Sequence, residues 1–315
     1  MTQPAVTVVI PAYNAADDVE TCLAGVLAQD YPDFEVIVVD DASSDKTPEV
    51  VRAHERVRLV RNVTNLGPAG ARNRGVAESR GELLVFLDSD SIVDDTQWLA
   101  RHAGVHAAGG AAVVGGGIRG VGRGPVARAD SYCHWVTNIP HGAPTVITAD
   151  RRPFGRVTRH LVTNNMSLRR STFDRIGPLD TRFRTGEDVD FCERALQLGI
   201  PLRLEPAIVV GHRDRERLSD FVRCFFEFGK DRIPLRQKNR SRLAWLMPKG
   251  LLSSIAMALP LTVSLWLQTT VMWWRHDKRV VASAPLILLA YVAMSAGMIS
   301  FCYDGCSQRR VPRSA

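Results

Sequence analysis

Leu83-Leu84-Val85-Phe86-Leu87-Asp88-Ser89-Asp90 joins five apolar residues directly to two carboxylates. A short apolar run without alternation is typical of a strand that is buried on both faces of a parallel sheet. Similar runs occur upstream at residues 6–10, 34–39 and 57–60, and segments with helical spacing of apolar residues separate them. Alternating strands and helices with short connections predict an α/β fold with a mostly parallel sheet flanked by helices.

Polar residues follow three of these four strands, at the point where each strand ends. They are Tyr13-Asn14, Asp40-Asp41 and Asp88-Ser89-Asp90. The carboxyl ends of parallel strands meet at one edge of a sheet, and ligands of such sheets bind beyond that edge. The sequence therefore predicts one functional site that the three groups share.

The rest of the predicted N-terminal domain, residues 1–215, is less regular. Residues 109–154 are rich in glycine and proline, and we expect irregular loops there that shape an acceptor site. Helical spacing returns at residues 171–176 and 188–198, and residues 202–210 are predicted to form a strand.

The chain ends in two strongly apolar segments. Residues 250–274 and 280–302 each contain a run without Asp, Glu, Lys or Arg that is long enough to cross a bilayer. We predict two transmembrane helices within residues 250–304. The alternative is a pair of buried or interfacial helices.

The charge distribution favours a membrane surface as partner. The net charge is +7, and many basic residues lie in residues 216–249, a predicted amphipathic juxtamembrane segment, and in the tail, 305–315. This pattern suits anionic lipid, and without zinc-finger spacing or a basic strand with aromatics we expect no nucleic-acid binding. The N-terminus lacks the features of a signal peptide. We therefore expect a multi-pass protein of the cell membrane with a cytoplasmic catalytic domain.

Three residues are candidate metal ligands. Asp88 and Asp90 offer carboxylate oxygens at a strand end, which suits Mg²⁺ or Mn²⁺ bound together with substrate phosphates. His212 follows the strand predicted at 202–210 and can add an imidazole nitrogen. The alternative for Asp88 and Asp90 is an acidic turn that caps the next helix.

Residues near the other strand ends are candidates for nucleotide binding. Tyr13, in the stretch Pro11-Ala12-Tyr13-Asn14, offers a ring that can stack on a base, although packing is the simpler explanation for one tyrosine. Asp41 can accept hydrogen bonds from a base or ribose, or cap a helix. Arg72 lies near the start of a predicted helix, where a pyrophosphate can bind. Gly67 and Gly70 do not form GxGxxG, and no Walker A lysine motif occurs.

Asp188 is the candidate general base. It opens the helix predicted at 188–198, where a carboxylate can take a proton from an attacking hydroxyl. The alternative is a favourable charge in the first helical turn.

Taken together, these residues resemble family 2 glycosyltransferases of the GT-A (nucleotide-diphospho-sugar transferase) fold over about the first 215 residues. The matching stretches are Val9-Ile10-Pro11-Ala12-Tyr13-Asn14, Val38-Val39-Asp40-Asp41-Ala42-Ser43-Ser44-Asp45, Asn65-Leu66-Gly67, Ala71-Arg72-Asn73, Phe86-Leu87-Asp88-Ser89-Asp90, Asn165-Met166-Ser167-Leu168-Arg169-Arg170, Gly186-Glu187-Asp188-Val189-Asp190 and His212.

The resemblance implies a metal-dependent, inverting transfer of a sugar from a nucleoside-diphosphate sugar, with a UDP-sugar favoured. By this resemblance the donor nucleotide is bound by Pro11, Tyr13, Asn14, Asp41, Arg72 and Asp88. Asp88 faces the ribose or the metal, and Asp90 and His212 bind the metal. Asp188 is the base, with Glu187 beside it.

The resemblance also bears on the acceptor. The segment after His212 lacks the Gln-x-x-Arg-Trp motif of processive synthases, so we expect addition of one or few sugars. A lipid-linked or polysaccharide acceptor fits best. The alternatives are a polyprenyl-phosphate sugar transferase and a non-catalytic, nucleotide-sugar-binding scaffold subunit.

Overall fold

The chain is divided into two compact units. The computed structural model describes residues 5–109, 112–149, 160–238, 248 and 250–308. The sheet unit comprises residues 1–121 and 137–213, and the helical unit comprises residues 122–136 and 214–315. The larger part of the helical unit starts at Asp214, and the domain boundary predicted at residue 215 stays a prediction. The prediction did not foresee that residues 122–136 leave the sheet unit to join the helical unit.

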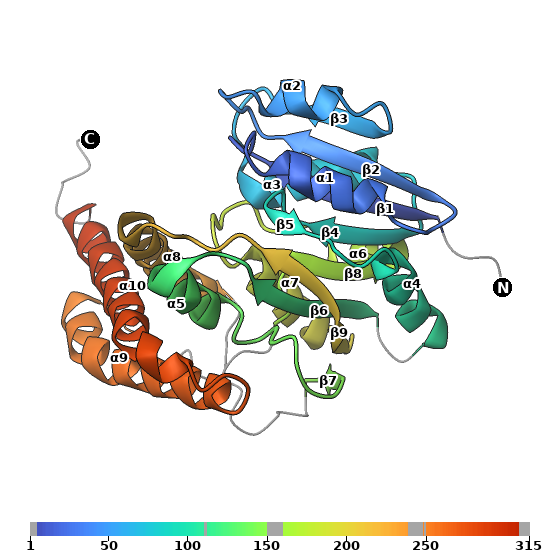
Figure 1. Ribbon diagram of the computed structural model, residues 1–315. Helices are drawn as coiled ribbons and strands as arrows, with labels where there is room; N and C mark the ends of the chain where they lie inside the picture. Colours follow the sequence, from blue (N-terminus) through green and yellow to red (C-terminus); the bar gives the residue numbers. More distant parts are fainter. Residues whose placement is uncertain (1–4, 110–111, 150–159, 239–247, 249, 309–315) are drawn as a thin grey trace, which may run out of the picture. The chain divides into compact units, whose positions relative to one another are not determined.

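A mixed sheet forms the centre of the sheet unit (Figure 1). Its order is β3-β2-β1-β4-β8-β6-β9-β5, with β7 also paired to β9. The strands are β1 (Val6–Ala12), β2 (Phe34–Asp40), β3 (Val57–Arg61), β4 (Leu83–Leu87), β5 (Ser91–Ile92), β6 (Val113–Gly120), β7 (Thr145–Ile147), β8 (Asn165–Arg169) and β9 (Leu202–His212). The first four strands of this order are parallel, as predicted. Beyond β4 the pairing is mixed, because β8 runs antiparallel to both β4 and β6.

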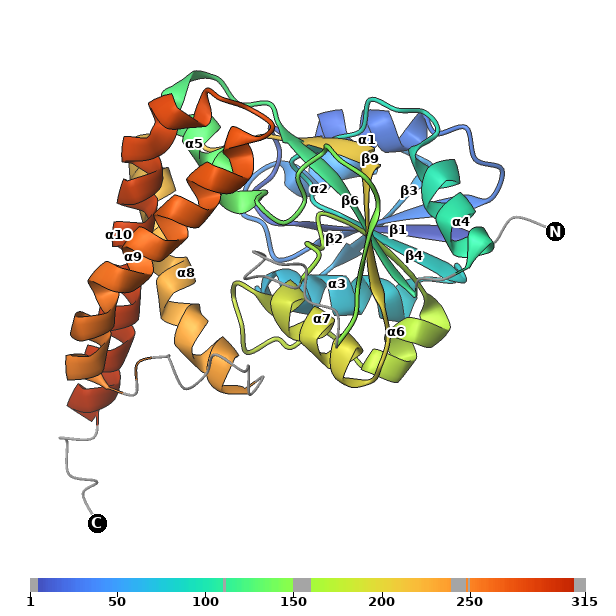
Figure 2. The ribbon, with the colours of Figure 1, turned by 90° about the horizontal axis from the view of Figure 1, so that it is seen from below.

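Helices cover both faces of this sheet, which confirms the predicted α/β class. Helices α3, α6 and α7 lie on one face, and α1 and α4 lie on the other (Figure 2). The helices of this unit are α1 (Val19–Leu27), α2 (Thr47–Arg52), α3 (Gly67–Glu78), α4 (Trp98–Ala108), α6 (Arg170–Ile176) and α7 (Glu187–Gln197). A core of buried apolar side chains, Val9, Phe86, Met166 and Phe191 among them, fills the space between the sheet and α3, α6 and α7.

The pairing of β1 explains how a strand tolerates a proline. β1 pairs with β2 over its whole length, including Pro11 opposite Val39, but with β4 only from Val6 to Val9. Pro11 therefore lies where pairing on the β4 side has ended, so its missing N–H leaves no bond unmade. β1 extends two residues beyond the predicted strand and carries Pro11 to the edge of the sheet.

The glycine-rich middle of the chain is not a set of irregular loops, which corrects the expectation for residues 109–154. It contains β6, a central strand, as well as β7 and the helix α5 (Gly124–His134). A Cβ on Gly116 would lie 2.0 Å from Asn165 Nδ2 and 2.2 Å from Ile208 O. The glycines of β6 are thus required by close packing, a reason that composition does not reveal. Residues 110–111 and 150–154 lie outside the described residues.

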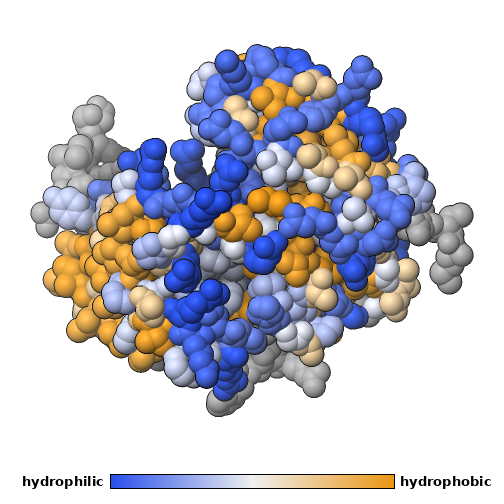
Figure 3. All heavy atoms as spheres, viewed as in Figure 1, coloured by the Kyte–Doolittle hydropathy of each residue, from blue (hydrophilic) through white to orange (hydrophobic). Residues whose placement is uncertain are grey.

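The helical unit is built from α5 and three long helices: α8 (Leu218–Lys238), α9 (Leu251–Trp274) and α10 (Val280–Gln308). Leu251–Trp274 and Val280–Asp304 are long and apolar enough to cross a membrane. Apolar side chains gather over α9 and α10 (Figure 3). α8 occupies the first part of the predicted juxtamembrane segment, whereas residues 239–247, 249 and the tail 309–315 lie outside the described residues.

Candidate active site

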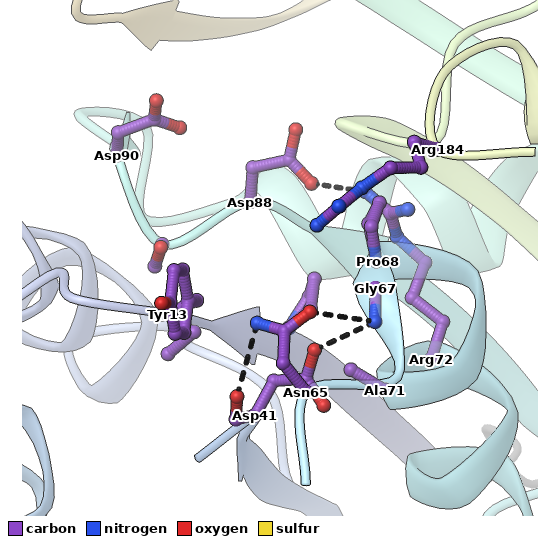
Figure 4. A pocket seen from close by; sticks show the side chains of 13 residues that line it. Tyr13, Asp41, Asn65, Gly67, Pro68, Ala71, Arg72, Asp88, Asp90 and Arg184 are labelled. Atoms are coloured by element: carbon purple, nitrogen blue, oxygen red, sulfur yellow. Dashed lines mark hydrogen bonds and ion pairs between the residues drawn. The ribbon is translucent and has the colours of Figure 1, made fainter. Parts of the chain in front are cut away.

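A pocket of about 260 Å³ opens at the carboxyl ends of β1, β2 and β4 (Figure 4). It is lined by Pro11, Ala12, Tyr13, Asp41, Asn65, Gly67, Pro68, Ala71, Arg72, Asp88, Ser89, Asp90 and Arg184. All three polar groups predicted to share one edge of the sheet contribute to it. Of the candidate residues, Asn14, Glu187, Asp188 and His212 are not among the lining residues, and each is connected to the site in a different way.

Asp41 holds the loop that leads into α3. The buried carboxylate accepts hydrogen bonds from Asn62 Nδ2 at 2.7 Å, Leu66 N at 2.9 Å and Gly67 N at 2.8 Å. Gly67 has a φ of 76°, which favours glycine at this turn. Asp41 therefore shapes one wall of the pocket through backbone contacts, besides facing the cavity itself.

Tyr13 and Asn14, both predicted to bind the donor nucleotide, have different surroundings. The Tyr13 ring is 54% exposed and lines the pocket, so it is free to meet a ligand. Asn14 has a φ of 49° and its Oδ1 accepts a hydrogen bond from Ser44 N at 2.9 Å. Its own N–H donates to Ser43 Oγ at 2.9 Å. Asn14 thus fixes the turn after Tyr13, and its side chain is directed to the following loop.

Arg72 connects two acidic groups that are far apart in the sequence. Its guanidinium is 3% exposed and forms ion pairs with Asp88 and, at 2.7 Å, with Glu187 Oε1. Asp88 follows β4, whereas Glu187 opens α7. A buried guanidinium between two carboxylates holds them in place and compensates their charge. The expected pyrophosphate contact of Arg72 therefore competes with two carboxylates already bound to it.

Glu187 and Asp188 form the first turn of α7, after Gly186 with a φ of 82°. Burial raises the pKa of Glu187 to about 7, with Arg72 acting in the opposite direction and Asp188 adding to the rise. Burial also raises the pKa of Asp188 to about 6, although Val189 N donates to its Oδ1 at 2.7 Å. A carboxylate with this pKa is a stronger base than an ordinary aspartate and is still mostly ionised at neutral pH.

Asp90 and His212 meet because a short strand pairs with the end of a long one. Ser91 of β5 lies opposite His212 of β9, which brings the neighbouring Asp90 carboxylate to the imidazole. Asp90 Oδ2 lies 3.2 Å from His212 Nε2. Asp88, the third predicted metal ligand, is paired with Arg72 instead. Within the described residues, no three His, Cys, Asp or Glu side chains are gathered as a ready metal site.

The sequence analysis missed Arg184. This exposed arginine lies in the connection between α6 and α7, and it lines the pocket on the same side as Arg72 and Asp88 (Figure 4). A basic residue four positions before Asp188 was the available signal, but the connection carries no periodic pattern that would have placed it. Asn65 was noted only as part of a motif. Its Nδ2 donates to Asp41 O at 3.2 Å and orders the same loop.

The chain is similar to known proteins in sequence and in fold. The family described as "Glycosyl transferase family 2" matches residues 7–177. Glycosyltransferase AglE of Haloferax volcanii is 29% identical over 251 residues, which are 77% of this chain and 77% of AglE.

Two solved structures share the fold. The mannosyltransferase PcManGT of Pyrobaculum calidifontis, in complex with GDP-Man and Mn²⁺, is 18% identical with a TM-score of 0.62 over 98% of this chain and 89% of its own. TarS 1–349 of S. aureus, in complex with UDP-GlcNAc, is 19% identical with a TM-score of 0.56 over 98% of this chain and 93% of its own. Because the family match covers more than half of the sequence, the chain belongs to glycosyl transferase family 2 and is a glycosyltransferase.

Proposed function

We propose that this glycosyltransferase moves a sugar, with inversion, from a nucleoside-diphosphate sugar to a hydroxyl of a lipid-linked or polysaccharide acceptor at a membrane. The observation that carries the proposal is the Arg72 bridge, because it joins the pocket wall at Asp88 to the acidic start of α7. This bridge supports a site in which a donor held in the pocket lies near a base on α7.

In the proposed reaction Asp188 is the base. The acceptor oxygen attacks the anomeric carbon, and the bond from that carbon to the donor diphosphate breaks, with its electron pair staying on the diphosphate. The hydroxyl proton passes to the Asp188 carboxylate. A pKa of about 6 supports this role, since the group is ionised at neutral pH and accepts a proton more readily than an ordinary aspartate. Glu187 positions Arg72 in this scheme.

The donor is proposed to bind with its base near Tyr13 and its diphosphate near Arg184 and Arg72. An exposed aromatic face suits stacking on a base, and an exposed guanidinium such as that of Arg184 suits a diphosphate. Pro11 and Asp41 complete the wall on the nucleotide side, with Asn14 holding the turn. UDP-sugars remain the favoured donors, which the UDP-GlcNAc complex of TarS supports, but the GDP-Man complex of PcManGT makes guanine the first competitor.

A divalent metal, Mg²⁺ or Mn²⁺, is proposed to be held by Asp90 and His212, with Asp88 nearby. Two ligands of one octahedral ion at about 2.1 Å lie roughly 3 Å apart, and the 3.2 Å between Asp90 Oδ2 and His212 Nε2 fits this. Such ions commonly take one or two protein ligands and complete their shell with substrate phosphates and water. When bound, the ion would neutralise charge on the leaving diphosphate as a Lewis acid.

Membrane attachment is proposed to come from the helical unit. Its two long apolar helices are candidate membrane spans, and the connection between them is basic. Basic residues beside apolar helices favour the anionic cytoplasmic leaflet. We therefore propose a cell-membrane protein whose catalytic unit faces the cytoplasm.

The deciding experiment measures donor binding and sugar transfer by the full chain in detergent. A panel of UDP- and GDP-sugars is titrated with Mn²⁺ or with EDTA, for the parent chain, Asp90→Asn, His212→Gln and Asp188→Asn. We expect one donor to bind only with metal, Asp90→Asn and His212→Gln to weaken that binding, and Asp188→Asn to bind the donor without turnover. NMR of the product then gives the anomeric configuration. Absence of binding by every donor, with and without metal, would overturn the enzymatic proposal.

A further inference from the structure

The α9–α10 hairpin exposes a stripe of apolar side chains and buries several hydroxyl groups. Exposed apolar residues follow one another along α9 at intervals of three and four, a single stripe made of Leu252, Ile255, Leu259, Val263, Leu267, Val271 and Trp274. Hydroxyl groups face inward: Thr262 Oγ1 lies 2.8 Å from Ser295 Oγ, and Thr269 Oγ1 lies 2.5 Å from Tyr291 Oη. Such a distribution suits lipid as the medium around α9.

α10 also contacts α8, and the two helices approach each other closely. A Cβ on Gly229 of α8 would lie 2.0 Å from Met294 O, and a Cβ on Gly297 of α10 would lie 1.9 Å from Phe226 O. Further along, Ile233 packs against Met298 and Cys302. From the Phe225–Tyr291 ring contact to Cys302, α8 accompanies α10 over about 17 Å at 1.5 Å per residue.

This partner of α10 is a charged helix. α8 exposes Arg223 and Glu227, and Lys230 Nζ lies 3.1 Å from Glu227 Oε1. If α10 crossed the hydrocarbon layer, which is roughly 30 Å thick, these charges would be carried into it beside the middle of the helix. Charged side chains at that depth are strongly disfavoured. The α8 side of the hairpin therefore belongs in water.

The hairpin tip is tied to α5, the helix that lies in the chain between the two segments of the sheet unit. Trp273 Nε1 donates to Tyr132 O at 2.8 Å, and Tyr132 Oη donates to Asp277 Oδ2 at 2.6 Å. α5 also contains buried Asp130, which is paired with Arg215 and with His134. Because the hairpin tip contacts α5, a tip on the far side of a bilayer would require α5, with its buried charges, to cross the bilayer as well.

The surroundings of the tip suit a lipid headgroup. Arg275, Lys278 and Arg279 are exposed, and Lys278 Nζ lies 6.0 Å from the centre of the half-exposed Trp274 ring. Tryptophan and basic side chains together are typical of the membrane interface.

We propose that the α9–α10 hairpin is a monotopic anchor: it lies in one leaflet of an anionic bilayer with the α9 stripe toward the acyl chains, and α8 and α5 remain in water. The tip and the end of α10 then stay on the side of the sheet unit. This inference rests on the membrane attachment proposed above and chooses the interfacial alternative over two crossings.

Cysteine labelling in sealed vesicles tests the topology. Arg80→Cys in the sheet unit, Lys278→Cys at the tip and Tyr303→Cys near the end of α10 are each placed in a Cys224→Ser/Cys306→Ser background, with that background as control. A membrane-impermeant maleimide is added from the side on which Arg80→Cys reacts. We expect Lys278→Cys and Tyr303→Cys to react from that side to the same extent, without detergent.

Three results would overturn the anchor. Protection of Lys278→Cys until detergent is added means that the hairpin crosses the bilayer. Protection of Tyr303→Cys alone means that α10 crosses with its tip on the near side. If the chain does not sediment with anionic vesicles at all, the proposed membrane attachment is wrong. Donor binding is measured separately, so this result leaves the proposed sugar transfer untouched.

A matched pair of charge substitutions tests the stripe. Leu259 is 73% exposed in the middle of the stripe, and Val63 is 97% exposed in the sheet unit. We expect Leu259→Glu to weaken partition into anionic vesicles by about tenfold or more, because acyl-chain contact is lost and a charge is added. Val63→Glu should leave partition unchanged. Equal effects of the two variants would contradict the proposed face.

Discussion

Replacing Arg72 with methionine tests whether the bridge between β4 and α7 is the structural centre of the site. Methionine has similar length without the charge. The change leaves Asp88 and Glu187 without their buried counter-charge, since Arg72 is 3% exposed and pairs with both. Removing one partner from a buried ion pair typically costs about 3–5 kcal/mol. Because the Asp88 side chain is 29% exposed and partly solvated, we expect the lower end of that range, about 3 kcal/mol, at pH 8.

The loss should depend on pH, and its sign follows from Glu187. In the folded chain the pKa of the Glu187 carboxyl is about 7, above its ordinary 4.5. Protonation of Glu187 therefore stabilises the fold at low pH, and this stabilisation is lost as pH rises through 7. Without Arg72 that pKa rises further, and the variant keeps its proton beyond pH 7. One additional pH unit of protonation is worth about 1.4 kcal/mol. The destabilisation at pH 6 should therefore be smaller than at pH 8 by about that amount.

The full chain is unfolded with urea in detergent at pH 6 and pH 8, and hydrogen exchange of sheet-unit peptides monitors the unfolding. This experiment measures the loss of stability and its dependence on pH. Arg74→Met is the matched control, because Arg74 lies on the same helix, is 54% exposed and pairs with Glu78. It should cost less than about 0.5 kcal/mol. Adding Glu187→Gln to Arg72→Met should restore a large part of the loss. Equal stability of the Arg72→Met and Arg74→Met variants would refute the bridge as a buried charge centre.

Three further substitutions or conditions have clear expected outcomes. Gly116→Ala should destabilise the sheet unit by at least about 2 kcal/mol in urea unfolding, because its Cβ would meet Asn165 and Ile208 O, whereas Gly104→Ala in α4, with open space around it, should be neutral or stabilising. His102 and His106 are buried, and desolvation lowers the pKa of each to about 4, so the unfolded chain binds protons at a higher pH than the folded chain. In thermal unfolding, stability should therefore fall by about 2 kcal/mol per histidine between pH 7 and pH 5. His106→Gln should reduce this fall. Asp41→Asn places an amide against three hydrogen-bond donors, so it should lower the free energy of unfolding by about 1–3 kcal/mol and also weaken donor binding. A variant with weaker donor binding and unchanged stability would show that Asp41 acts only through ligand contact.

The sequence by itself determined the parallel half of the sheet and the edge where the site lies. Residues 83–87 were predicted as a buried strand and are β4, because an uninterrupted apolar run needs burial on both faces. The meeting of Tyr13, Asp41 and Asp88 followed from strand direction alone, since parallel strands end at the same edge. The two apolar C-terminal helices were equally legible from composition, but composition does not tell a helix that crosses a bilayer from one that lies in it.

Tertiary structure alone decided which side chains touch. Arg72 and Glu187 are 115 positions apart, and the pairing of β5 with β9 brings Asp90 to a histidine more than 100 positions away. No local pattern encodes such partners, because they are set by packing of elements distant in sequence. The glycines of β6 were misread for the same reason: their place in a central strand depends on Asn165 and Ile208 at the other side of the contact. The periodicity of apolar residues predicts the secondary structure and the buried face of one segment. Close backbone approach and ion pairing depend on two segments that are distant in the sequence.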